Sequence, residues 1–211
     1  MNIYIYRDFQ KKSQSHQLLQ IALKDFLGWA SNSADLPIFK GEKGKPYVKI
    51  DDVYFNISHS HQVWVCAMDH RNLGIDVEVL RKRSFEKLAN KYFSTEELAY
   101  IFDGNTLDEF TTDENIRTES APSKSSKEKC SQELKLKRFF QVWTFKEAYA
   151  KLKGESIFEN LNVNSSDRKA LVGVNVKQLD LGQDIIATVA MEGTENYDQE
   201  DCLKILQITK G

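Results

Sequence analysis

The chain is poor in cysteine and contains no long apolar run. Its 211 residues include three cysteines, Cys66, Cys130 and Cys202, with no C-x-x-C pair and no zinc-like spacing to histidine. We therefore expect reduced thiols, with Cys66 and Cys202 buried as small apolar side chains. No stretch of about 18 apolar residues and no signal-peptide pattern is visible, so the sequence predicts a cytoplasmic protein that does not enter a membrane.

The sequence also lacks an excess of either charge. It has 29 Lys and Arg against 31 Asp and Glu, for a formal net charge of −2. Such a balance gives no general electrostatic attraction to nucleic acid or to a membrane surface, so neither partner is expected. A chain of 211 residues can bury a good core as one domain or as two small ones.

Apolar periodicity and turn residues divide the first part of the chain into short elements. The expected elements are a strand at 2–9, a helix at 16–30, a Gly- and Pro-marked loop at 41–46, a hairpin over 47–58 turning at Asp51 and Asp52, and strands at 63–70 and 73–80.

The second part begins with two short helices within 84–102, broken at Ser94, which forms a capping-box pattern with Glu97. Residues 103–135 are polar and lack apolar periodicity, so we expect a mobile insertion. The elements expected after it are a helix at 136–154 closed by Gly154 and strands at 170–179, 184–192 and 202–208.

A short internal similarity suggests that the two parts are related. VCAMD at 65–69 resembles TVAME at 188–192, and each part contains one long helix and about three antiparallel-looking strands. This favours an α+β fold of two similar halves, each a small antiparallel sheet packed with a long helix. The expected halves are residues 1–80 and 81–211.

Charged residues at two places have the spacing of a metal and phosphate site. Asp76 and Glu78 share one face of a predicted strand, and Glu147 and Lys151 lie one turn apart on a predicted helix. Carboxylates suit a hard cation such as Mg²⁺, and a lysine suits the phosphate that it carries. Taken singly, each pair is explained better by a solvated strand face or by a surface salt bridge.

Two further segments offer groups to an anion. Ser58 and His59 follow an alternating strand, and Lys43 and Lys45 lie among glycines in the loop. Taken singly, these features are explained better by a structural histidine and by a simple turn. Ser58 and His59 are not expected to form a nucleophilic pair, because adjacent strand residues point to opposite faces.

Five motifs in this order closely resemble the Sfp-type 4′-phosphopantetheinyl transferases. The resemblance runs from Gly44 to Gly154 and is interrupted by the insertion at 103–135. The motifs are GKP at 44–46, FNxSHS at 55–60, GIDxE at 74–78, FS at 93–94 and WTxKEAxxKxxG at 143–154.

The resemblance implies transfer of phosphopantetheine from coenzyme A to a serine of an apo carrier protein, releasing 3′,5′-ADP, with the active site in a cleft between the halves. We also expect a monomer. The implied roles are Mg²⁺ binding by Asp76, Glu78 and Glu147, phosphate binding by Lys151, Ser58 and His59, and nucleotide binding by Lys45. By the same resemblance, Glu147, Lys151 and His59 take part in catalysis.

Several points stay open from the sequence. The base is Glu147 or a metal-bound water that it orients. The family's Arg-rich N-terminal stretch is represented only by Lys11, Lys12 and His16, which leaves the 3′-phosphate contacts unassigned. The alternative functions are a Mg²⁺-dependent nuclease or phosphodiesterase using the same carboxylates, and a carrier-binding module without catalysis. The balanced charge argues against the first, and the retention of all the implied metal carboxylates argues against the second.

Overall fold

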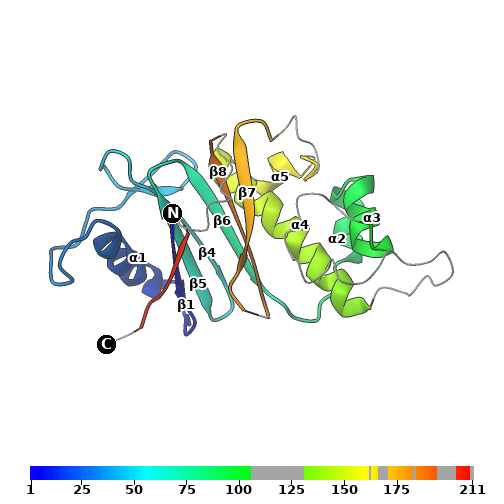
Figure 1. Ribbon diagram of the computed structural model, residues 1–211, viewed down its shortest axis with the longest axis horizontal. Helices are drawn as coiled ribbons and strands as arrows, with labels where there is room; N and C mark the ends of the chain where they lie inside the picture. The colour runs from blue at the N-terminus through cyan, green and yellow to red at the C-terminus, as the bar shows by residue number, and fades with distance from the viewer. Residues whose placement is uncertain (106–130, 162, 166–170, 183, 194–202, 210–211) are drawn as a thin grey trace.

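The described part of the protein is built around two larger β-sheets that pack against each other, with a long helix on each outer side (Figure 1), and a two-stranded sheet lies apart from them. The computed structural model describes residues 1–211 except 106–130, 162, 166–170, 183, 194–202 and 210–211. None of the described helices combines the length and the apolar composition that crossing a membrane demands. The α+β class expected from the sequence is confirmed.

The first sheet has four strands in the order β4-β5-β1-β9, and helix α1 covers its outer face. Its strands are antiparallel except for β9, which runs parallel to β1. The elements are β1 (Asn2–Tyr6), α1 (Ser13–Phe26), β4 (Tyr54–Ser60), β5 (Val63–Asp69) and β9 (Lys204–Gln207).

The second sheet has three antiparallel strands in the order β6-β8-β7, and helix α4 covers its outer face. Helices α2 and α3 lie on the far side of α4, where aromatic side chains join the three helices (Figure 1). The elements are β6 (Leu73–Val79), α2 (Glu86–Tyr92), α3 (Thr95–Asp103), α4 (Gln132–Lys153), α5 (Ile157–Asn160), β7 (Val174–Asp180) and β8 (Ile185–Glu192).

The central core lies between the two sheets. Ile3, Ile5 and Val65 of the first sheet pack against Ile75 and Val77 of the second, and all five are buried. The alternation of β6 explains this arrangement, because Ile75 and Val77 point into the core while Asp76 and Glu78 point the other way. The expected orientation of this strand is therefore confirmed.

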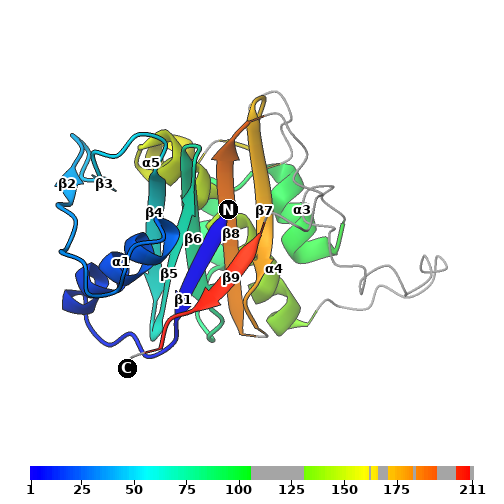
Figure 2. The ribbon, with the colours of Figure 1, turned by 60° about the vertical axis from the view of Figure 1, so that its left-hand side comes forward.

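The two sheets exchange a strand across the expected halves. β6 precedes residue 80 but pairs with β8, and β9 lies near the C-terminus but pairs with β1 (Figure 2). The two similar segments, 65–69 and 188–192, fall in β5 and β8, which are inner strands of their sheets. The division of the chain at residue 80 stays a prediction, and hydrogen bonds run across it.

The hairpin expected over 47–58 is wrong. β4 pairs with β5, and residues 46–47 form the short strand β3 (Pro46–Tyr47), which pairs with β2 (Phe39–Lys40) across the Gly-rich loop. The turn at Asp51 and Asp52 is present, but it joins β3 to β4 without pairing them. Alternation identifies a strand and its faces, whereas the identity of its partner depends on tertiary packing.

Several other expectations concern the helical part of the chain. The helix break at Ser94 and its capping box with Glu97 are confirmed, as is the closure of α4 by Gly154, whose φ is 67°. Most of the expected insertion, 106–130, lies outside the described residues. The one-turn helix α5 was not predicted.

Helix α4 approaches β6 at Gly74 more closely than a side chain would permit. A Cβ atom at this position would lie 2.1 Å from the carbonyl oxygen of Ala148 and 2.4 Å from the backbone nitrogen of Leu152. Both are backbone atoms, so no side-chain rotation can relieve the overlap. The glycine thus sets how near the helix comes to the strand.

We expect Gly74→Ala to lower the free energy of unfolding by about 3 kcal/mol or more, because α4 and β6 must separate. Gly41→Ala is a suitable control, since its added Cβ would meet the Lys45 carbonyl oxygen only at 3.5 Å. Urea denaturation of both variants measures the difference. A Gly74→Ala protein as stable as Gly41→Ala would contradict the close approach.

Candidate active site

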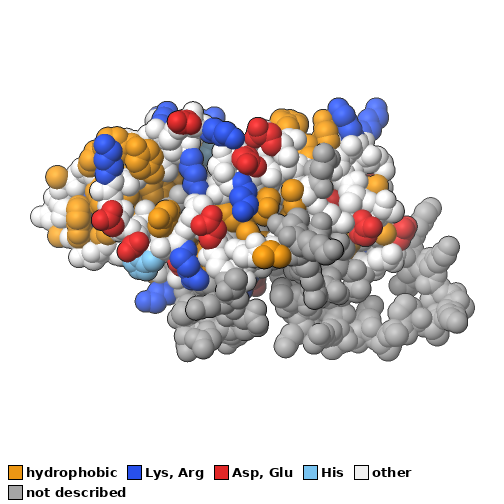
Figure 3. All heavy atoms as spheres, turned by 90° about the horizontal axis from the view of Figure 1, so that it is seen from above, with side chains coloured by type: hydrophobic (Ala, Val, Ile, Leu, Met, Phe, Trp, Pro, Cys, Tyr) orange, Lys and Arg blue, Asp and Glu red, His pale blue; other side chains and the backbone are white. Residues whose placement is uncertain are grey.

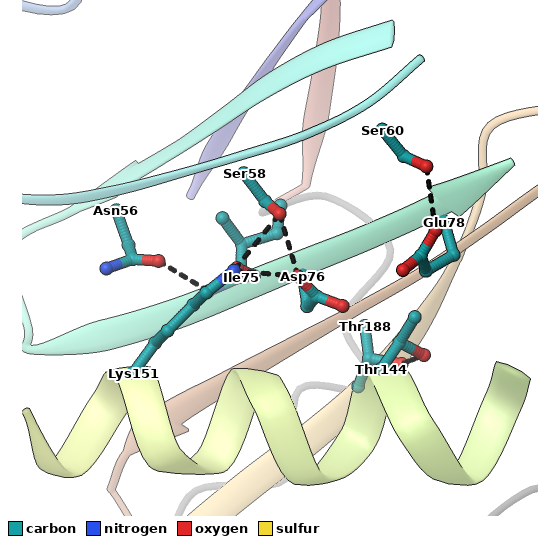
Figure 4. Close-up of polar contacts among 9 residues, drawn as sticks. All are labelled: Asn56, Ser58, Ser60, Ile75, Asp76, Glu78, Thr144, Lys151 and Thr188. Carbon is teal, nitrogen blue, oxygen red and sulfur yellow. Dashed lines mark hydrogen bonds and ion pairs between the residues drawn. The ribbon is translucent and has the colours of Figure 1, made fainter. Parts of the chain in front are cut away.

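β4 and β6 are edge strands of different sheets, and side chains join them (Figure 4). The Ile75 backbone N–H donates to Asn56 Oδ1 at 3.1 Å, and the Val79 backbone N–H donates to Ser60 Oγ at 3.2 Å. Alternate side chains of β4 thus supply the acceptors that a neighbouring backbone would supply in a continuous sheet. The edge of β6 that faces β4 is therefore closed by side chains rather than by a backbone ladder.

The same row of β4 side chains holds the two carboxylates of β6. Ser58 Oγ donates to Asp76 Oδ1 at 2.7 Å, and Ser60 Oγ donates to Glu78 Oε2 at 2.7 Å. Asp76 is only 6% exposed, and Glu78 is half-buried. A solvated strand face therefore does not describe this pair.

Lys151 reaches from α4 to the strand (Figure 4). Its Nζ lies 2.7 Å from Asp76 Oδ1 and donates to Ser58 Oγ at 3.0 Å and to the Ile75 carbonyl oxygen at 3.2 Å. Within the described part of the chain its ion pair is formed with Asp76, and not with Glu147 one turn earlier. The simple i,i+4 surface pair is thus not the arrangement found.

These groups line one cleft between β4, β6 and α4, with a volume of about 240 Å³. The cleft brings together six of the seven site residues expected from the sequence. Its lining residues are Ile57, Ser58, His59, Asp76, Val77, Glu78, Trp143, Glu147 and Lys151.

Glu147 carries the largest resolved pKa shift in the cleft. Burial raises its pKa from 4.5 to about 7, the charge of Asp76 and then that of Glu78 add to the shift, and the Lys151 ammonium opposes it. The pKa of Glu78 is also raised, chiefly by burial, while its hydrogen bond from Ser60 acts in the opposite direction. The cleft therefore concentrates negative charge where water screens it poorly.

The donor set of the cleft fits a hard divalent cation, because such ions prefer carboxylate oxygens. A cation would also relieve the repulsion that helps to raise the pKa of Glu147. Among the residues that the structure describes, no three His, Cys, Asp or Glu side chains stand close enough together to enclose an ion. Asp76 is engaged by Lys151 and Ser58, so sharing an ion requires the carboxylates to turn toward one another.

His59 lies at the rim of the cleft, where its ring stacks on Phe9 with centroids 5.1 Å apart. Its pKa is lowered, chiefly because the ring is partly shielded from water, and further by the charges of Lys12 and Lys151. The effect of Lys12 means that the start of α1 lies near this rim. A neutral imidazole and an ammonium are thus both available to an anion there.

Lys45 does not line the cleft. Its ammonium is bound by Asn72 Oδ1 at 3.1 Å, the Leu73 carbonyl oxygen at 3.0 Å and the Lys151 carbonyl oxygen at 3.1 Å. Burial lowers its pKa to about 8. These contacts tie the Gly-rich loop to the start of β6 and the end of α4. Nucleotide binding by Lys45 stays a prediction, and it would require the ammonium to exchange one of these protein acceptors for the nucleotide.

The sequence did not indicate which residues support the site, although Asn56 and Ser60 belong to the FNxSHS motif. Asn56 and Ser60 brace β6, and Thr144 on α4 shares a hydrogen bond of 2.8 Å with Thr188 on β8 (Figure 4). The alternation of polar residues along β4 was the available signal for Asn56 and Ser60. No local pattern links Thr144 to Thr188, because 44 residues separate them.

A larger cavity of about 480 Å³ lies beside α1 and includes His16, one of the expected substitutes for the family's arginines. Several of the polar side chains around it are engaged with the protein itself. Gln20 bonds to the backbone of Leu36, and Lys24 pairs with Asp35 at 2.8 Å. Its size therefore does not make it a second reactive centre.

The segment that carries most of the cleft residues matches a known protein family. A family model described as the 4′-phosphopantetheinyl transferase superfamily matches residues 72–198, which is more than half of the chain. The chain belongs to the 4′-phosphopantetheinyl transferase superfamily. The superfamily match begins just before β6 and includes Asp76, Glu78, Glu147 and Lys151.

Individual transferases agree with the superfamily assignment. The 4′-phosphopantetheinyl transferase gsp of Aneurinibacillus migulanus is 30% identical over 139 residues, covering 66% of this chain and 47% of the relative. The 4′-phosphopantetheinyl transferase Sfp of Bacillus subtilis strain 168 is 25% identical over 156 residues, covering 72% and 58%. The chain thus spans about half the length of these curated relatives.

We expect Glu147→Gln to stabilise the protein at pH 8 in the absence of divalent cations. The folded state binds this proton more tightly than the unfolded chain, so the free energy of unfolding falls as the pH rises from 4.5 to about 7. Each unit of pKa shift corresponds to about 1.4 kcal/mol, and we expect a gain of about 1–3 kcal/mol at pH 8 that disappears near pH 4.5.

Urea denaturation at a series of pH values measures this gain. Glu133→Gln is the control, because Glu133 is an exposed carboxylate in the first turn of the same helix. A Glu147→Gln protein with the pH profile of wild type would contradict the raised pKa.

Proposed function

We propose that this protein transfers 4′-phosphopantetheine from coenzyme A to a serine hydroxyl of an apo acyl- or peptidyl-carrier protein and releases 3′,5′-ADP. The main support is the meeting of three motifs in one cleft. Ser58 and His59 come from β4, Asp76 and Glu78 from β6, and Glu147 and Lys151 from α4.

Mg²⁺ held by Asp76, Glu78 and Glu147 would neutralise charge on the coenzyme A pyrophosphate. Lys151 lies within hydrogen-bond distance of Asp76 and is 27% exposed, so its ammonium can exchange a carboxylate for a phosphate oxygen. His59 would donate to the same phosphates, and Ser58 would do so once its hydroxyl is released from Asp76. Fixed donors of this kind stabilise the charge that builds up as the bond between the β-phosphorus and the leaving 3′,5′-ADP breaks.

We propose that the general base is Glu147 or a metal-bound water that it orients. In the cleft without a cation, burial and the neighbouring carboxylates raise the pKa of Glu147 to about 7, and a bound cation would lower that pKa. Either base would take the proton of the carrier serine as the serine oxygen bonds to the β-phosphorus. Trp143 lines the cleft one turn before Glu147 and forms an apolar wall that limits the access of water.

A nuclease or phosphodiesterase activity is not supported. Binding to a phosphate backbone draws on clustered Lys and Arg, whereas the face shown in Figure 3 carries acidic and basic side chains interspersed. The relatives named above are all transferases.

We further propose that the protein works as a monomer in the cytoplasm. Cys66 is a free, fully buried thiol, which fits the apolar role expected for it and a reducing compartment. Burial also raises the pKa of this thiol, so it is inert as a nucleophile.

The proposed reaction is tested by mass spectrometry of an apo carrier protein incubated with coenzyme A and Mg²⁺. The carrier should gain about 340 Da, the mass of the transferred group, and chelation of the metal with EDTA should prevent the gain. Asp76→Asn and Glu147→Gln should each slow the transfer by about a hundredfold or more, because each removes a ligand charge. Glu133→Gln should retain full activity. Near-native turnover of either cleft variant at saturating Mg²⁺ would rule out the proposed metal site.

Lys151 is tested separately. Lys151→Met should lower kcat/KM by about tenfold or more through the loss of one charge-assisted contact. Lys151→Arg should restore only part of the rate, because a planar guanidinium does not replace a compact ammonium. Steady-state kinetics with thermal melts of both variants separate this effect from misfolding. Wild-type kinetics of the Met variant would reduce Lys151 to a structural partner of Asp76.

A further inference from the structure

Lys146 precedes Glu147 in the KEA motif but points away from the cleft. The side chain is 1% exposed, and its Nζ donates to the Leu161 carbonyl oxygen at 2.9 Å and to the Val163 carbonyl oxygen at 2.6 Å. It also forms an ion pair of 2.9 Å with Glu97 Oε1. The three protons of the ammonium thus have three protein acceptors.

Glu97 is also buried, and both of its carboxylate oxygens have hydrogen-bond partners. Its side chain is fully buried, and its Oε1 accepts a second bond from the Ser165 backbone N–H at 2.9 Å. Its Oε2 accepts from the Ser94 backbone N–H at 2.9 Å as part of the cap of α3. One ion pair therefore joins α4 to the start of α3 and to the segment that follows α5.

Consecutive residues of a helix project about 100° apart around its axis. Fixing the side chain of Lys146 against α3 consequently fixes the direction in which Glu147 leaves the helix. The hydrogen bond between Thr144 and Thr188 fixes another face of α4 against β8. A rotation of α4 that moved Glu147 out of the cleft would break the contacts of a buried ammonium, which is costly when its partner charge stays buried.

We propose that Lys146 is a positioning residue, whose ion pair with Glu97 holds α4 at the rotation that directs Glu147 toward Asp76 and Glu78. This inference rests on the proposed metal role of these carboxylates. It predicts that breaking the pair weakens cation binding in the cleft even where the fold survives.

The experiment measures Mn²⁺ binding by isothermal titration calorimetry, in the presence of coenzyme A, alongside the melting temperature. The double variant Glu97→Gln/Lys146→Met removes both buried charges together and so leaves neither unpaired. Its Kd for Mn²⁺ should rise by about tenfold or more, as expected when the support of a metal ligand is lost. In transfer assays kcat should fall while KM for coenzyme A changes little.

Two controls separate positioning from general destabilisation. Leu23→Ala removes a fully buried side chain from α1, in a different core cluster, and should lower the melting temperature without changing the Kd. Lys153→Met removes an exposed lysine of the same helix. The interaction described for Lys153 is with the Tyr149 ring, so this variant should change neither the melting temperature nor the Kd for Mn²⁺. Lys146→Arg keeps the charge, so its Kd should lie between those of wild type and the double variant.

A wild-type Kd in the folded double variant would overturn the inference and leave the proposed function standing. If the double variant does not fold, Lys146→Arg decides in the same way, and a wild-type Kd again overturns the inference. Absence of Mn²⁺ binding by the wild-type protein would overturn both the proposed metal site and the positioning role.

Discussion

The closure of the β6 edge by side chains is the interaction on which the site depends. An edge strand exposes backbone groups that need partners, and here Asn56, Ser60 and Lys151 provide them from β4 and α4. The hydrogen bonds that satisfy the backbone also determine which side chains stand beside Asp76 and Glu78. Structural closure and the assembly of reactive groups are therefore the same set of contacts, and Gly74 permits both by letting α4 lie against the strand.

The ion pairs that Lys146 and Lys151 of helix α4 form differ in their access to water. In the pair of Lys146 with Glu97 the side chains are 1% and 0% exposed, whereas in the pair of Lys151 with Asp76 they are 27% and 8% exposed. A dry pair with every donor used is difficult to rearrange. A partly wet pair can exchange partners at lower cost, because water compensates the charges during the exchange. The fixed pair faces the protein interior, and the exchangeable pair faces the cleft.

Local patterns in the sequence were sufficient to predict most strands, the capping box at Ser94 and the face that Asp76 and Glu78 share. Each of these depends on residues close together in the chain. The pairing of β6 with β8 and the use of Lys45 as a bridge to α4 were not predicted, since both depend on segments distant in sequence. Alternation shows which face of a strand is apolar, but it contains no information about the neighbouring strand.

The exchange of strands between the sheets has a consequence for folding. β1 pairs with β9, so the first sheet gains its fourth strand only when residues about 200 positions apart in the chain meet. Until then β1 keeps an unpaired edge that can join a strand of another molecule. Completion of the first sheet therefore depends on a contact between distant parts of the chain, and removal of β9 should favour aggregation over a stable N-terminal fragment.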